Sequence, residues 1–238
     1  MKRALQVIAA LVAGGFAVVA YAYLTLPDVR PLRTTNPTTT AFIELRARDA
    51  RARGEPVRKV MRWQSYSRIA RDLKRAVLVA EDDAFWQHEG VDFGQLQDSL
   101  QTDWQRGRFS RGASTITQQL AKNLYLSPSR NPLRKFREWI IARRLEAELP
   151  KARILELYLN VIEWGDGIYG VDAAARTYFH ESSSELTPEQ AALLAAAIIN
   201  PRVYSPAHPN ARLLRRQQLI LRRMHVVVEP ELSAQVVQ

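Results

Sequence analysis

Residues 80–93 read AEDDAFWQHEGVDF, and the rest of the chain is organised around this stretch. Three adjacent carboxylates, Glu81, Asp82 and Asp83, follow an apolar helical run, and His88 comes shortly after them. Neighbouring carboxylates repel one another, so one of them can keep a raised pKa and exchange protons near neutral pH. Taken alone, such a cluster is more often the solvated end of a surface helix. The sequence on either side of the cluster is therefore needed to choose between a proton-exchanging group and a solvated helix end.

The flanking sequence predicts a mainly helical fold. The apolar residues Ile69, Leu73, Val77 and Ala80 recur every three or four positions and lead a helix into the carboxylates. Capping residues and periodicity predict further helices over residues 92–104, 114–124, 131–149, 154–161, 187–200 and 210–224. Ser114 is the expected N-cap of the second of these. No alternating run is long enough to predict a sheet.

Three of these helices have a predicted place in the core. The residues expected to face inward are Leu133, Phe136, Ile140, Leu145 and Leu149 in the helix over 131–149, and Leu213, Leu214, Ile220 and Leu221 in the last helix. Residues 191–199 read AALLAAAII, so their helix has no polar face and is expected at the centre of the domain. Thr187 and Gln190 form a predicted capping box at its start.

Composition limits the classes of partner and chemistry. The chain has 238 residues, and about 200 of them follow the first apolar segment, which is enough for one domain with a hydrophobic core. The formal net charge of +10 predicts an anionic partner, which can be nucleic acid, a membrane surface or a phosphorylated substrate. Because the chain has no cysteine, disulfides, thiolate metal sites and a cysteine nucleophile are excluded.

The first apolar run, residues 5–26, has no charged residue over 22 positions. At about 1.5 Å per residue, a helix of this length crosses a hydrocarbon core of roughly 30 Å. A cleavable signal peptide has an apolar region of only about 7–15 residues, so the length favours a retained transmembrane helix. Lys2 and Arg3 favour a cytoplasmic N-terminus, although Arg30 and Arg33 weaken the charge asymmetry.

The sequence therefore divides into three predicted parts. Residues 1–26 form a cytoplasmic stub and transmembrane anchor, residues 27–40 form a linker rich in proline and threonine, and residues 41–238 form one domain. The start of that domain, residues 41–63, is strongly basic. It is either a surface element near anionic headgroups or a solvated face, and the sequence favours neither.

Polar groups elsewhere add a second carboxylate and several cations. Arg134 and Glu138 lie one helical turn apart, which alone indicates an ordinary ion pair. Lys122 and the amides of Gln118 and Gln119 follow Ser114, where a helix N-terminus would attract anions. The loop RGRFSRGA at 106–113 suits a mobile segment that closes on an anion. Together these are the parts needed to transfer a sugar away from a phosphate leaving group.

Five motifs occur in a fixed order: EDxxFxxHxGxD at 81–92, GxSTITQQLAKN at 112–123, RKxxE at 134–138, ILExYLN at 154–160 and GIYGxxAAAxxYF at 167–179. This order closely resembles the peptidoglycan glycosyltransferases of glycosyltransferase family 51. The resemblance implies a mainly α-helical, lysozyme-like, two-lobed glycosyltransferase domain behind a single N-terminal transmembrane helix. It also implies an inverting enzyme that polymerises lipid II into β-1,4 glycan strands and releases undecaprenyl diphosphate.

The resemblance also implies a role for each matching residue. Glu81 would be the general base that deprotonates the acceptor hydroxyl, with Asp82 tuning it and Glu138 assisting on the donor side. The residues expected to neutralise the donor diphosphate are Lys122, Arg134 and Lys135. The other expected substrate contacts are Phe85, His88, Ser114, Thr115, Gln118 and Gln119. For His88, a hydrogen-bonded structural histidine is the more common alternative.

Two other functions compete with this interpretation. A lytic, lysozyme-like glycosidase would share the carboxylates, but it has no diphosphate to hold with cations. A domain that binds nucleic acid or scaffolds other proteins explains the net charge but none of the motifs. Because the chain contains neither S-x-x-K nor K-T-G, a transglycosylase without a transpeptidase activity is expected.

The resemblance implies partners and a location as well. Lipid II, the growing glycan strand, the membrane and other cell-wall synthesis and division proteins are the expected partners, and nucleic acid is not. The expected location is the bacterial inner membrane, with a single pass and the catalytic domain on the periplasmic side. No metal-ligand spacing is present and no cofactor is expected, so a divalent cation that assists the diphosphate would be held largely by the substrate.

Overall fold

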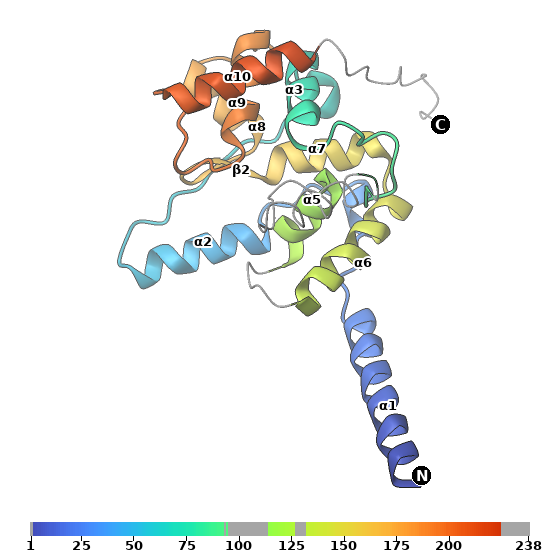
Figure 1. The fold of residues 1–238 in the computed structure, drawn as a ribbon. Helices are drawn as coiled ribbons and strands as arrows, with labels where there is room; N and C mark the ends of the chain where they lie inside the picture. The colour runs from blue at the N-terminus through green and yellow to red at the C-terminus, as the bar shows by residue number, and fades with distance from the viewer. Residues whose placement is uncertain (1, 93, 95–113, 127–131, 225–238) are drawn as a thin grey trace.

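The computed structural model of the chain describes residues 2–92, 94, 114–126 and 132–224. In Figure 1 a body of packed helices sits above a single helix, α1, that projects away from it toward the N-terminus. The loop predicted at 106–113 and nearly all of the helix predicted over residues 92–104 lie outside the described residues.

The described elements are mostly helices, which confirms the predicted mainly helical class. In chain order they are α1 (Lys2–Leu24), η1 (Arg30–Arg33), α2 (Ala41–Ala52), β1 (Val60–Met61), η2 (Tyr66–Arg68), α3 (Arg71–Glu81), α5 (Ile116–Tyr125), α6 (Pro132–Glu148), α7 (Lys151–Val161), β2 (Glu163–Gly165), β3 (Ile168–Tyr169), α8 (Val171–Phe179), α9 (Pro188–Ala197) and α10 (Ala211–Met224).

A small three-stranded sheet is present, although the sequence predicted none. Its strand order is β1-β3-β2, with β1 parallel and β2 antiparallel to β3. Each strand has only two or three residues, so none is long enough to show an alternating pattern. Gly167, in the turn between β2 and β3, has a φ of +72°, and a Cβ there would lie 2.6 Å from the Cβ of Arg58. The turn therefore requires glycine.

Helix α9 lies at the centre of one group of helices. It packs against α3 and α10, and residues 191–197 are all buried, which confirms the prediction made from its missing polar face. The predicted capping box is also confirmed, because Thr187 accepts the Gln190 amide hydrogen while the Gln190 side chain accepts that of Thr187 at 2.8 Å. The helix ends at Ala197, slightly before the predicted end at residue 200.

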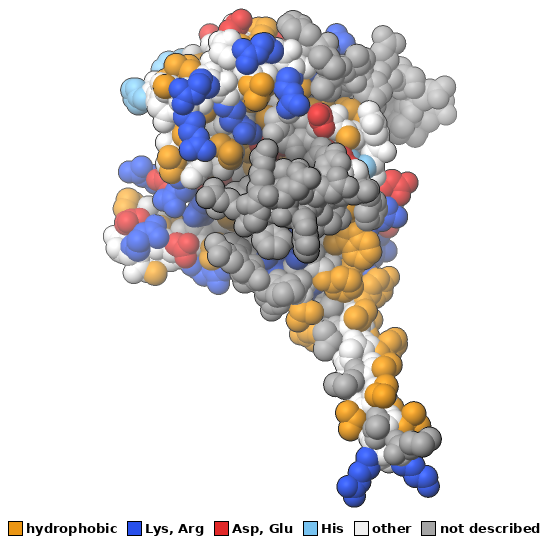
Figure 2. All heavy atoms as spheres, in the orientation of Figure 1, with side chains coloured by type: hydrophobic (Ala, Val, Ile, Leu, Met, Phe, Trp, Pro, Cys, Tyr) orange, Lys and Arg blue, Asp and Glu red, His pale blue; other side chains and the backbone are white. Residues whose placement is uncertain are grey.

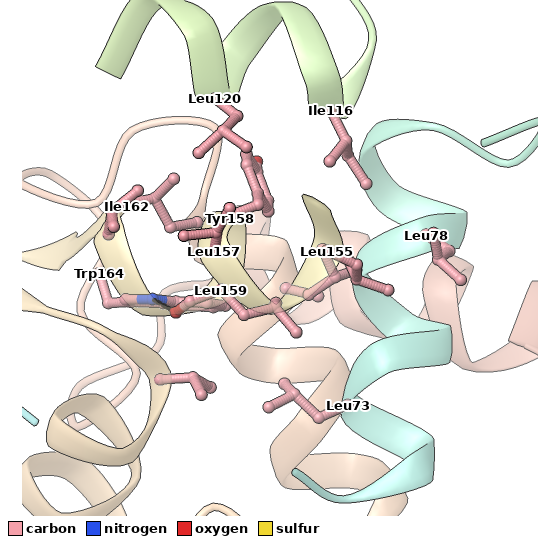
Figure 3. Packing of buried hydrophobic residues seen from close by; sticks show 14 of the residues in the cluster. Leu73, Leu78, Ile116, Leu120, Leu155, Leu157, Tyr158, Leu159, Ile162 and Trp164 are labelled. Atoms are coloured by element: carbon pink, nitrogen blue, oxygen red, sulfur yellow. Dashed lines mark hydrogen bonds between the residues drawn. The ribbon is translucent and has the colours of Figure 1, made fainter. Parts of the chain in front are cut away.

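Helix α5 lies at the centre of a second group, which contains α2, α6 and α7. Figure 3 shows Ile116 and Leu120 of α5 above the buried side chains of α7, which include Tyr158, while Leu73 and Leu78 of α3 lie on the other side. All these side chains belong to one buried cluster. The hydrophobic core is therefore continuous through α7, and it fixes α3 and α5 relative to each other.

The predicted inward faces of α6 and α10 are confirmed only in part. Leu145 of α6 and Leu149 just after it are buried as predicted, but Leu133 is 49% exposed, and the other buried residues of α6 are Glu138, Ile141 and Ala142. In α10, Leu213 and Ile220 are buried as predicted, whereas Leu214 is 41% exposed, and Gln217 and Met224 complete the buried face. Each inward row contains a polar residue with a partner: Glu138 pairs with cations, and Gln217 donates to the carbonyl of Glu189 at 2.8 Å. A pattern of apolar residues at helical spacing cannot identify such buried polar residues.

The predicted linker is packed against the domain. Val29 and Leu32 are buried in the core, and η1 lies within this segment. Arg153 of α7 donates to the carbonyls of Leu32 and Thr35, at 2.8 Å and 3.1 Å. These contacts tie the segment to α7, so it does not run free between α1 and the body of the protein.

Helix α1 carries exposed apolar side chains along its length, which Figure 2 shows as a band that continues onto the base of the body. Its C-terminal end contacts α6, where the Arg144 guanidinium lies 4.5 Å from the centre of the Tyr23 ring. Arg137, also in α6, donates to the carbonyl of Thr25 at 3.0 Å. Within the part of the chain that the structure describes, no helix combines the length and the apolar character needed to cross a membrane.

Candidate catalytic site

Asp82 joins the end of α3 to the start of α5. Its side chain is buried, and one carboxylate oxygen accepts the backbone N–H of Ile116 at 2.8 Å. His88 Nε2 lies 2.9 Å and 3.1 Å from the two carboxylate oxygens. Because the Gly90 N–H donates to His88 Nδ1 at 3.1 Å, the hydrogen of a neutral imidazole is on Nε2 and points at Asp82. Both ring nitrogens of His88 therefore have hydrogen-bond partners within the protein.

The N-terminus of α5 was predicted to attract anions, and the anion that the structure shows there is the carboxylate of Asp82. The carboxylate of Asp82 accepts the first helical N–H and occupies the place where the helix dipole favours negative charge. Ser114 is not the N-cap as predicted. Thr115 caps the helix, because its hydroxyl accepts the Gln118 N–H at 3.2 Å and donates to the carbonyl of Gly90 at 2.7 Å.

Glu81 is the last residue of α3, and its side chain is only 14% exposed. One carboxylate oxygen accepts the Gln119 side-chain amide at 3.0 Å, and the other lies 3.5 Å from an Nη of Arg216. Burial raises the pKa of Glu81, while the bond from Gln119 and the charges of Arg216 and Lys122 oppose the rise.

The predicted raised pKa in the acidic cluster is confirmed for Glu81, but its main cause is different. Burial contributes most, and the charge of Asp82 contributes least among the causes. Asp83 is exposed, so only two of the three carboxylates belong to the site. The cluster is therefore more than a solvated helix end, because its first two side chains point into the protein.

Glu138 holds two cations on α6. Its side chain is 4% exposed, and its carboxylate oxygens pair with Arg134 at 2.7 Å and with Lys135 at 2.5 Å. Lys135 also donates to the hydroxyl of Ser114 at 3.2 Å, which connects α6 to the start of α5. The ordinary i,i+4 ion pair is thus present, and it also fixes the position of both cations.

Lys122 of α5 is close enough to Glu81 and to Glu138 for both charges to act on it. Its pKa is lowered mainly by burial, while the charge of Glu138 raises it, those of Arg134 and Lys135 lower it, and that of Glu81 raises it. Among the described residues, its ammonium forms no ion pair. It is therefore a partly desolvated cation that can pair with an incoming anion.

Two residues predicted to contact substrate have buried side chains. Phe85 is fully buried, with its ring edge-on to those of Trp86 and His88 and with the Lys151 ammonium 4.4 Å from its centre. Gln118 is 5% exposed, and its carbonyl oxygen has no hydrogen-bond partner within the described residues. We interpret Phe85 as a support for the turn that carries His88.

Sequence reasoning missed two residues that bear on Glu81. Tyr158 donates to Gln119 at 3.0 Å and lies inside the ILExYLN motif, which was the available signal for it. Arg216 lies on α10, 135 positions from Glu81, and the basic composition of that helix gave no reason to single it out. Only the packing of α10 against α3 brings Arg216 to the site.

Residues 51–225 match the family model described as Transglycosylase. The chain belongs to this family. It is 47% identical over 196 residues to the biosynthetic peptidoglycan transglycosylase of Laribacter hongkongensis, covering 82% of this chain and 86% of that protein. Proteins of the same name from Nitrosomonas eutropha and Aromatoleum aromaticum are 44% and 49% identical, over 81% and 71% of this chain and 79% and 74% of theirs.

The residues that match the family model include the whole of the candidate site. Its range begins in α2 and ends just after α10, so it includes both carboxylates, the cations of α5 and α6, and Arg216. All these residues therefore belong to the part of the chain that defines a transglycosylase.

We predict that Asp82→Ala lowers both stability and turnover. Hydrogen bonds to charged groups contribute about 1.5–3 kcal/mol each, so the free energy of unfolding should fall by at least about 1.5 kcal/mol. Chemical denaturation followed by circular dichroism measures this change. Asp83→Ala, at an exposed position, is the control and should lower the free energy of unfolding by no more than about 1 kcal/mol, since interactions of exposed charged groups contribute little. Equal stability of the two variants would contradict the role given to Asp82.

Proposed function

We propose that this transglycosylase polymerises lipid II into β-1,4 glycan strands during peptidoglycan synthesis, and that Glu81 acts as its general base. The observation that carries the proposal is that α5 connects a buried carboxylate with a set of cations. Its Gln119 donates to Glu81, and its Lys122 is close enough to Glu138, which holds Arg134 and Lys135, for the two charges to interact. The relatives from Laribacter hongkongensis, Nitrosomonas eutropha and Aromatoleum aromaticum are named as biosynthetic peptidoglycan transglycosylases, which supports the reaction class. A lysozyme-like arrangement of two lobes stays a prediction, as does the three-part division of the chain.

On the acceptor side, Glu81 takes the proton of the attacking sugar hydroxyl. A carboxylate in water is a weak base, and burial makes Glu81 a stronger one by bringing its pKa closer to neutrality. Gln119 and Arg216 act in the opposite direction and favour the ionised form that a base requires. Asp82 contributes by fixing the end of α3 and hence the direction of the neighbouring side chain.

On the donor side, Lys122, Arg134 and Lys135 neutralise the departing diphosphate. Negative charge develops on the leaving oxygen as the glycosidic bond breaks, so fixed cations stabilise the transition state more than the ground state. Glu138 holds two of these cations in place before substrate arrives. We therefore give Glu138 a positioning role on the donor side, in place of direct proton transfer.

The two sides together define a single displacement. The acceptor oxygen forms a bond to the anomeric carbon while the bond from that carbon to the diphosphate oxygen breaks. The hydroxyl proton passes to Glu81, and the electron pair of the broken bond leaves with undecaprenyl diphosphate. Because the donor sugar is α-linked to diphosphate, one inversion gives the β-1,4 linkage without a covalent glycosyl-enzyme.

No cofactor takes part in this scheme. A divalent cation that assists would bind mainly through the diphosphate oxygens, because Mg²⁺ commonly keeps few protein ligands in phosphate sites. Among the residues that the structure describes, no group of three or more His, Asp or Glu side chains is arranged around a metal position. Turnover measured in chelator and after addition of Mg²⁺ tests this assignment.

We further propose that residues 1–26 anchor the protein in the inner membrane, with the domain on the periplasmic side among other cell-wall synthesis and division proteins. The uncharged run at 5–26 and the exposed apolar side chains of α1 support this proposal. The substrate is itself a membrane lipid, so an anchor would concentrate enzyme and substrate on one surface.

Deletion of residues 1–26 tests the anchor. We expect the shortened protein to fold, to lose most of its activity on lipid II embedded in liposomes, and to lose less in detergent. Equal activity of the whole and shortened proteins on liposomes would contradict the anchor.

We predict that Glu81→Gln lowers kcat by about 10²–10⁴-fold while the Michaelis constant for lipid II stays close to that of the wild type. The change removes a base and keeps the size of the side chain. Lys122→Met is the matched donor-side variant, and it should weaken the use of lipid II as donor without lowering stability, because a partly buried cation is removed.

Steady-state turnover of lipid II and thermal unfolding of both variants check these expectations. If Glu81→Gln keeps more than a few per cent of the wild-type rate, Glu81 is not the base. If Lys122→Met loses activity only in proportion to its unfolded fraction, the cation has no role at the diphosphate.

A further inference from the structure

The described residues of α7 include one hydroxyl that reaches toward the site from the hydrophobic core. Tyr158 is fully buried, and Figure 3 shows its ring beside Leu120 of α5 and Leu157 of α7. Its hydroxyl donates to the side-chain carbonyl oxygen of Gln119 at 3.0 Å. Burial raises the pKa of Tyr158 well above its usual value, so the phenol keeps its hydrogen throughout the pH range of an enzyme assay.

The other end of the Gln119 amide faces Glu81. The amide nitrogen donates to a Glu81 carboxylate oxygen at 3.0 Å and lies 3.4 Å from the carbonyl of Ser114. Both of these partners are acceptors, so this end of the amide must be the NH₂ group. Rotation of the amide by half a turn would place its carbonyl oxygen against the carboxylate. Tyr158 opposes that rotation, because its hydroxyl needs an acceptor on its own side.

We propose that Tyr158 is a positioning residue for the base: its buried hydroxyl holds the Gln119 amide with the NH₂ group directed at the Glu81 carboxylate. This inference rests on the proposed role of Glu81. Through the chain Tyr158–Gln119–Glu81, a group in the core of α7 controls a hydrogen bond at the site, although it does not contact the reacting atoms.

Gln119 is the contact of Glu81 that most needs such control. The other groups that act on the carboxylate are Asp82 beside it, Lys122 on α5 and Arg216 on α10. Each of these carries a fixed sign of charge, so rotation of its side chain cannot reverse its influence. The amide has a positive and a negative end, and its influence on the carboxylate reverses when it turns over.

We predict that Tyr158→Phe moves the pH dependence of kcat. The substitution removes one oxygen and keeps the ring, so Gln119 loses its fixed orientation. The hydrogen bond from Gln119 lowers the pKa of Glu81, and its loss therefore raises that pKa. Because the base must be ionised, the acidic limb of the kcat profile should move upward by roughly 0.4–1 pH unit. The Michaelis constant for lipid II should not change.

Tyr178→Phe provides a matched control. The Tyr178 hydroxyl donates to the backbone carbonyl of Trp164 at 3.2 Å, and Glu81 does not influence its pKa. Both variants lose one hydrogen-bonding hydroxyl, so a general loosening of the fold would affect them alike. We expect Tyr178→Phe to leave the pH profile unchanged even if it lowers the unfolding temperature.

A double-mutant cycle tests whether Tyr158 acts through Gln119. Gln119→Met, which keeps the length of the side chain and removes the amide, should by itself reproduce the upward shift. Adding Tyr158→Phe to this background should produce no further shift.

Three results would overturn the proposal: an unchanged profile in Tyr158→Phe, an equal shift in Tyr178→Phe, or a second full shift when Tyr158→Phe is added to Gln119→Met. If Tyr158→Phe does not fold, Gln119→Met is the test. An unchanged pH profile in Gln119→Met would show that the hydrogen bond from Gln119 does not affect the pKa of Glu81, and the proposal would fail. The outcome is separable from the function of Glu81. If Glu81→Gln is active, Glu81 is not the base. If Glu81→Gln is inactive and Tyr158→Phe has the pH profile of the wild type, Glu81 remains the base and only the positioning role of Tyr158 is refuted.

Discussion

The site depends on the bond between the Asp82 carboxylate and the first N–H of α5, which His88 supports from the other side. This contact fixes the end of α3 against the beginning of α5. Glu81, the next residue back along α3, is thereby directed at Gln119, one turn into α5. A further turn places Lys122 where its charge acts on both Glu81 and Glu138. One buried carboxylate therefore sets the relation between the acceptor and donor sides.

Partial burial shifts the pKa values of Glu81 and Lys122 in opposite directions. It raises the pKa of Glu81 and so strengthens a base, whereas it lowers the pKa of Lys122 and so favours pairing of that cation with an anion. Other groups oppose each of these two pKa shifts. Gln119 and Arg216 favour the ionised form of Glu81, and Glu138 favours the charged form of Lys122. In both groups burial has the larger influence on the pKa, and the neighbouring charges and hydrogen bonds reduce the shift without cancelling it.

Local patterns predicted much of this protein. The helix that leads into Glu81, the capped apolar helix α9 and the motif order were all legible in the sequence, because each depends on residues a few positions apart. Features that depend on tertiary packing were not. The inward faces of α6 and α10 include Glu138 and Gln217, whose partners lie on their own or another element, and Arg216 reaches Glu81 only through the contact of α10 with α3. The cause of the raised pKa was also hidden, since burial cannot be read from adjacent carboxylates.

The central claim is that a base and a set of cations on opposite sides of the donor sugar make this protein a transferase. Incubation of the purified whole chain with labelled lipid II, and separately with uncrosslinked glycan strands, tests this claim most directly. A hydrolase would need a general acid for a sugar leaving group and would have no use for cations at a diphosphate. The account predicts long, lysozyme-sensitive polymer from lipid II and no cleavage of the strands. Shortened strands with no polymer from lipid II would contradict it.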